Sequence, residues 1–147
     1  MSRREPRYSP LRRDSQGEAE DVSVGAMIAL FALLAAAADP VAGTWVGTSL
    51  CQIRPSPCHD EQVVYKIKAT GQQRYRIEAY KIIAGQEQYM GPLDLRFDAA
   101  AHRLNGSNRD RAGIDHPWIF TLRGNHMSGR ALTGDGKIFR LIEIDRR

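Results

Sequence analysis

The chain has 147 residues, of which 42% are hydrophobic and 26% are charged, and its formal net charge is +4. This composition excludes a collagen, a coiled coil, a disulfide-dense miniprotein and a fully disordered chain. The length predicts one globular domain with little room for a second. Positive and negative residues alternate rather than forming blocks, which is typical of a solvated surface.

Residues 26–38 read AMIALFALLAAAA and form an unbroken apolar run. A membrane-spanning helix needs about 20 residues, whereas the apolar core of a secretory signal has about 7–15. We therefore predict a signal-peptide helix, cleavage after Ala38, a periplasmic or secreted protein, and no permanent membrane span. The alternatives are a buried Ala-rich helix and a membrane anchor. Residues 1–25 are polar, and we interpret them as a disordered or mis-annotated extension.

Cys51 and Cys58 are the only cysteines of the chain. In an exported protein, two cysteines this close together predict a disulfide, which would make the 51–58 loop rigid. A metal site with His59 and Asp60, or a Cys-His-Asp nucleophile, are the alternatives. The spacing lacks a paired Cys-x-x-Cys motif, and consecutive residues of an extended chain point to opposite sides. We therefore expect no metal, no other cofactor and no catalytic residue here.

Apolar and polar residues alternate in short segments that are bounded by Gly, Pro, Asn and Asp, and this pattern predicts strands. In one segment the alternation slips at Ala79-Tyr80, which indicates a bulge. Eight short strands in residues 39–147 avoid open edges best as an all-β, antiparallel, up-and-down barrel, with a two-sheet sandwich as the alternative. The predicted strands span 43–50, 61–69, 73–83, 88–98, 102–107, 117–123, 126–132 and 137–145.

The first predicted strand opens with Gly43-Thr44-Trp45. This motif resembles the opening signature of the lipocalin and avidin superfamily of calycin-type barrels. The resemblance implies that Trp45 closes one barrel end and that a basic residue of the last strand packs across its ring. Arg140 shares an inward face with Ile138, Ile142 and Ile144, and a buried charge needs a partner, so we predict Arg140 for this role.

A second resemblance covers residues 43–65. It is to the start of small exported bacterial proteins of no established function, which open with Gly-Thr-Trp-x-Gly-Thr-Ser and carry a Cys pair. This resemblance agrees with export and adds no activity.

Several inward-facing aromatic residues suggest what the barrel encloses. They pack either as a filled core or as the lining of a site for a small apolar or aromatic ligand. We expect binding of such a ligand rather than catalysis, with an enzyme as the third hypothesis. The alternative function is a protein-interaction or inhibitor module that uses the 51–58 loop. The candidate ligand-binding residues are Tyr65, Tyr75, Met90, Trp118 and Phe120.

Two charged groups of residues suggest other functions. Asp60 and Glu61 are adjacent at a strand start, where neighbouring carboxylates diverge, so we expect turn capping or solvation rather than hydrolysis, with a contact at the barrel rim as the alternative. Four basic residues on the outer face of the second and third strands could contact nucleic acid. Export and the interrupting Glu78 argue against that partner, so we expect no nucleic acid. These four are Lys66, Lys68, Arg74 and Arg76.

Overall fold

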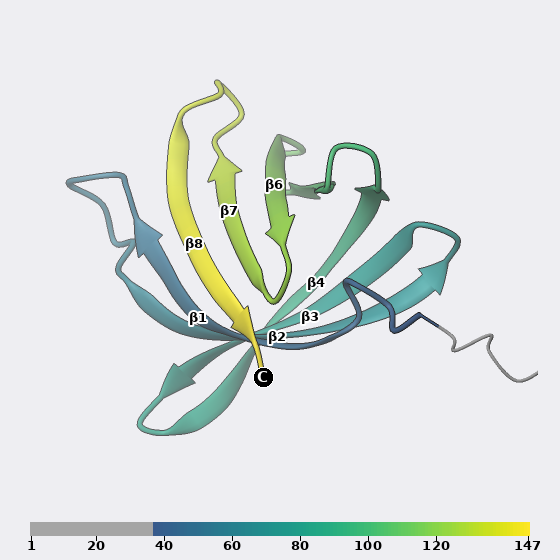
Figure 1. The fold of residues 1–147 in the computed structure, drawn as a ribbon. Helices are drawn as coiled ribbons and strands as arrows, with labels where there is room; N and C mark the ends of the chain where they lie inside the picture. Colours follow the sequence, from purple (N-terminus) through teal and green to yellow (C-terminus); the bar gives the residue numbers. More distant parts are fainter. Residues whose placement is uncertain (1–36) are drawn as a thin grey trace, which may run out of the picture. The chain divides into compact units, whose positions relative to one another are not determined.

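Eight antiparallel strands close into a barrel in the computed structural model, which describes residues 37–147 (Figure 1). The predicted extension and all but the last two residues of the predicted signal segment lie outside the described residues. Each strand pairs with its neighbour in sequence, and β8 pairs with β1. The strands are β1 (Gly43–Cys51), β2 (Glu61–Gly71), β3 (Arg74–Ile83), β4 (Gln86–Asp98), β5 (Arg103–Arg109), β6 (Asp115–Arg123), β7 (His126–Leu132) and β8 (Ile138–Arg146).

This topology confirms the all-β, up-and-down barrel and excludes the sandwich for this domain. The predicted bulge is present, because the register of β3 against β4 shifts between Ala79 and Tyr80. Within residues 37–147, no helix with the length and apolarity to cross a membrane is found.

Alternating side chains of every strand fill most of the barrel interior. The buried set includes a tryptophan, tyrosines, phenylalanines and many aliphatic residues. Space for the Phe120 ring comes from Gly129, which lies directly across from it on β7. A Cβ atom at Gly129 would lie 2.4 Å from Phe120 Cδ1, far inside van der Waals contact, so only glycine fits here.

One end of the barrel, which we call the closed end, is sealed by Trp45. Its ring is 0% exposed, and its Nε1 donates a hydrogen bond of 2.9 Å to the carbonyl oxygen of Val41. The Arg146 guanidinium lies 4.6 Å from the centre of the Trp45 ring and donates to the carbonyl oxygens of Ala42 and Pro40. The segment before β1 and the C-terminus both lie at this end (Figure 1).

The prediction that Arg140 covers Trp45 is wrong, because Arg146 occupies that place. Across the β1–β8 pairing, Trp45 lies opposite Arg146, whereas Arg140 lies opposite Cys51 near the other end. Both arginines share one face of β8. Alternation identified this face correctly, but it does not say at which level along the barrel axis a side chain lies.

The other end, which we call the open end, carries the loops 52–60, 84–85, 110–114 and 133–137. The predicted disulfide between Cys51 and Cys58 is present in the first of these loops. The loop is also held by hydrogen bonds. Ser56 Oγ donates to the Ile53 carbonyl at 2.8 Å, and the Cys51 amide donates to Asp60 Oδ1 at 2.8 Å.

Candidate functional site

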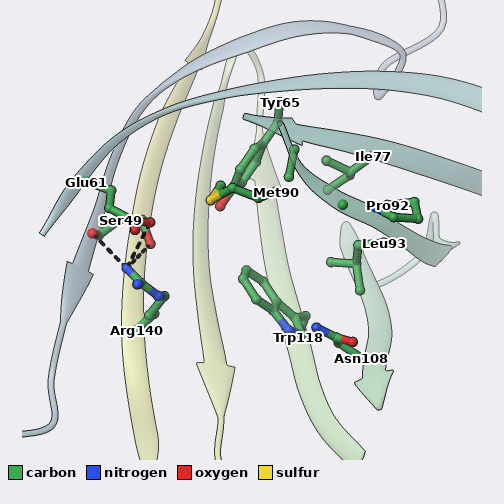
Figure 2. A pocket seen from close by; sticks show the side chains of 12 residues that line it. Ser49, Glu61, Tyr65, Ile77, Met90, Pro92, Leu93, Asn108, Trp118 and Arg140 are labelled. Atoms are coloured by element: carbon green, nitrogen blue, oxygen red, sulfur yellow. Dashed lines mark hydrogen bonds and ion pairs between the residues drawn. The ribbon is translucent and has the colours of Figure 1, made fainter. Parts of the chain in front are cut away.

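A cavity of about 180 Å³ lies at the open end of the barrel. Its two sides differ in chemistry (Figure 2). Side chains from β3 and β4 make one side apolar, and β1, β2 and β8 contribute a polar group on the other. The apolar lining is Tyr65, Ile77, Ala79, Met90, Pro92, Leu93 and Trp118, the polar side consists of Ser49, Glu61 and Arg140, and Asn108 of β5 lies beside Trp118.

Three of the five predicted ligand-binding residues line this cavity. Tyr65 and Trp118 form its wall, and Met90, which is 41% exposed, lies at its rim. Phe120 packs behind the wall, with its ring centre 6.4 Å from that of Tyr65 and 6.2 Å from that of Trp118. Phe120 therefore supports the lining without being part of it.

Tyr75 is the predicted ligand-binding residue that lies furthest from the cavity. Its hydroxyl donates to both carboxylate oxygens of Asp39 at 3.1 Å, and its ring packs edge-on against Phe97. Burial favours a higher pKa for Asp39, but hydrogen bonds from the amides of Ala42 and Val41 and from Tyr75 outweigh it and hold the pKa below its ordinary value. Tyr75 thus belongs to the closed end.

A charged cluster occupies the polar side of the cavity. Arg140 Nη1 lies 3.3 Å from Glu61 Oε2 and donates to Ser49 Oγ at 3.2 Å. Glu61 Oε1 is also 4.0 Å from Lys81 Nζ. The Glu61 and Arg140 side chains are only 12% and 15% exposed, so they interact with little screening from water. The cluster therefore places two cations around one carboxylate.

The expectation that Glu61 caps a turn or is solvated is wrong, because its side chain faces the cavity. Glu61 is the first residue of β2 and pairs with Ser49 of β1. The alternation that places Val63 and Tyr65 inside also places Glu61 inside. That signal was present in the sequence, whereas nothing there indicated that Lys81 and Arg140 would flank it. Asp60, by contrast, does cap the loop, as expected.

The aromatic wall carries two buried hydrogen-bonding groups, the phenol of Tyr65 and the indole nitrogen of Trp118. Burial raises the pKa of the Tyr65 phenol well above its ordinary value, so the phenol stays protonated. Trp118 Nε1 is buried and has no hydrogen-bond acceptor among residues 37–147. Figure 2 places this nitrogen beside the Asn108 side chain. A buried, unpartnered N–H is costly, so Trp118 holds an unsatisfied donor beside the cavity.

On the outer face of β7 and β8, Ser128, His126 and Asp145 lie in the order of a hydrolase relay. His126 Nδ1 is 2.7 Å from Asp145 Oδ1, and Ser128 Oγ is 3.3 Å from His126 Nε2. However, Ser128 donates to Glu143 at 2.8 Å. The hydrogen bond to Asp145, followed by that to Glu143, raises the pKa of His126, which favours the cation and opposes its use as a general base. This cluster links two strands, and its hydrogen bonding does not fit a Ser-His-Asp relay.

The predicted basic outer face of β2 and β3 is present but partly neutralised. Lys66 forms an ion pair with Glu87 at 2.5 Å, and Arg76 forms one with Asp94 at 2.7 Å. Within residues 37–147, no group of three His, Cys, Asp or Glu side chains is placed to hold a metal ion.

No protein-family model, curated protein or solved structure matches this chain. A functional assignment therefore depends on the chemistry of the cavity itself, because a barrel fold alone does not determine a function.

Proposed function

We propose that this barrel binds a small apolar or aromatic molecule in the cavity at its open end. The observation that carries the proposal is the cavity itself, in which an apolar wall that includes Tyr65 and Trp118 faces a small polar group. Enclosure removes apolar ligand surface from water, and a few polar groups fix the orientation of the ligand. Ser49 and Arg140 supply such groups.

The size of the cavity limits the ligand. An apolar cavity of about 150 Å³ in another protein holds benzene. The volume of about 180 Å³ found here therefore suits a molecule with one ring or a short branched chain. It is too small to enclose a long-chain lipid.

Export to the periplasm or the medium is part of this proposal. The Cys51–Cys58 disulfide supports it, because such bonds persist in oxidising compartments. The up-and-down topology likewise supports a kinship with lipocalins and avidins. N-terminal sequencing of the protein from an exported fraction should find Asp39 first, and a mature protein that begins at Met1 would contradict export.

Native mass spectrometry of protein purified from its producing cells tests ligand binding. We expect a small molecule to co-purify with the chain. Ala79→Leu, which adds bulk inside the cavity, should abolish this co-purification. Lys68→Leu, which adds the same side chain on the exposed outer face of β2, should leave it unchanged. Equal occupancy in the two variants would contradict binding in this cavity.

A second candidate function is favoured by the 52–60 loop, which is cross-linked, internally hydrogen-bonded and exposed. It presents Ile53 and Arg54 at its surface. A rigid loop of this kind could enter a site on a partner protein with little loss of conformational entropy. An empty cavity in the purified protein, together with a partner complex that Arg54→Ala disrupts, would favour this function.

A further inference from the structure

The guanidinium of Arg140 uses only one of its three nitrogens within the described part of the chain. Nη1 makes every contact: to the Ser49 carbonyl at 3.3 Å, to Ser49 Oγ at 3.2 Å, to the His59 carbonyl at 3.4 Å and to Glu61 Oε2 at 3.3 Å. All four are longer than the 2.7–2.9 Å typical of charge-assisted bonds. Arg140 is therefore weakly held for a side chain that is only 15% exposed.

The free edge of Arg140, formed by Nε and Nη2, has the geometry that binds carboxylates. These two nitrogens form a planar fork that can donate two parallel hydrogen bonds to one carboxylate. Arg140 lines the cavity, and Figure 2 shows it across the cavity from the apolar residues Ile77 and Leu93. A ligand that spans the cavity would thus meet the fork at one end and aliphatic side chains at the other.

The charge balance also favours an anion. Arg140 and Lys81 are the cations of the cluster, and Glu61 is its one carboxylate. An arriving monoanion would balance this excess positive charge. An arriving cation would have to compete with both basic groups for Glu61, in a site where burial strengthens repulsion.

We infer that the cavity selects a small amphipathic carboxylate, with its carboxylate on the Nε–Nη2 edge of Arg140 and its apolar body against Trp118 and the β3–β4 wall. This inference rests on the proposed function and names the class of its ligand. It assigns Arg140 a role in specificity in place of the barrel closure predicted from the sequence.

Three probes that share one ring and differ in charge test this inference: benzoate, benzyl alcohol and benzylamine. Each is titrated into the full chain, and the indole N–H signal of Trp118 is followed by NMR. We expect benzoate to bind about tenfold more tightly than benzyl alcohol, since a hydrogen bond to a charged group contributes roughly that factor. Benzylamine should bind most weakly.

Variants of the charged cluster identify the source of the preference. Arg140→Gln should reduce the affinity for benzoate to that for benzyl alcohol, and Glu61→Gln should raise the affinity for benzoate more than that for benzyl alcohol. If Arg140→Gln does not fold, the change in benzoate affinity of Glu61→Gln still tests the inference. Equal binding of benzoate and benzyl alcohol, or a preference for benzylamine, would overturn the inference and leave the proposed function standing. Binding of none of the three would contradict both.

Discussion

Gly129→Ala should destabilise the barrel through a single contact. The added Cβ would lie 2.4 Å from Cδ1 and 2.5 Å from Cε1 of Phe120. Carbon atoms pack at about 3.5–4.0 Å, so the ring would have to move by about 1 Å. Phe120 is 1% exposed and is packed against Tyr65 and Trp118, which leaves no free space on that side. Overpacking of this kind costs about 1–3 kcal/mol.

Urea denaturation with the disulfide intact measures this loss in the free energy of unfolding. Gly71→Ala is the matched control, because a Cβ there meets only Cδ and Cβ of Arg74, at ordinary distances of 3.8 and 3.9 Å. This control should be neutral or should stabilise the protein by up to about 1 kcal/mol. Equal stability of the two variants would refute the packing of Phe120 over Gly129.

A double variant separates the clash from a general intolerance of alanine in β7. Replacing Phe120 with leucine removes the ring that the new methyl group would meet. Gly129→Ala should therefore cost less in the Phe120→Leu background than in the natural chain, and the difference is their interaction free energy. Because Phe120 supports Trp118, Gly129→Ala should also weaken binding of benzyl alcohol.

Three further predictions concern the closed end and the loop. Arg146→Gln should lower the free energy of unfolding by about 1.5–3 kcal/mol, the range for hydrogen bonds to a charged group, and an unchanged urea midpoint would contradict its role over Trp45. Replacing Cys51 and Cys58 with serine should remove about 2.5 kcal/mol in the chain-entropy model while the circular dichroism stays that of a barrel; loss of the β spectrum would contradict a local role. In the folded state, hydrogen bonds to Asp39 outweigh the effect of burial and lower its pKa. The ionised Asp39 carboxylate therefore stabilises the fold above about pH 3.8, and this stabilisation is lost as the pH falls through the lowered pKa. Asp39→Asn should therefore flatten the dependence of stability on pH in this acid range, and an unchanged acid profile would contradict the role of Asp39.

The strands could be predicted from the sequence because each carries its own local pattern. Their predicted ends lie within two residues of those in the structure. Alternation also identified the inward faces of β2, β3, β4, β6 and β8, including the face of β8 that carries Arg140. These features depend on neighbouring residues alone.

The level of each side chain along the barrel could not be predicted in the same way. It depends on the register between strands, which turns and barrel stagger determine. For this reason Tyr75 and Tyr65, both inward, lie at opposite ends, and Arg146 rather than Arg140 covers Trp45. The polar cluster was missed for the same reason, since it joins residues from four strands.

The central claim, that the open end binds a small molecule, is tested most directly by the two tryptophans of the chain. Trp118 lines the cavity, whereas Trp45 is sealed at the closed end with its Nε1 bonded to Val41. In the ¹⁵N-labelled full chain titrated with benzyl alcohol, the Trp118 indole signal should shift and saturate while the Trp45 signal stays fixed. A Trp118 signal that does not move, or two signals that move in parallel, would contradict the claim.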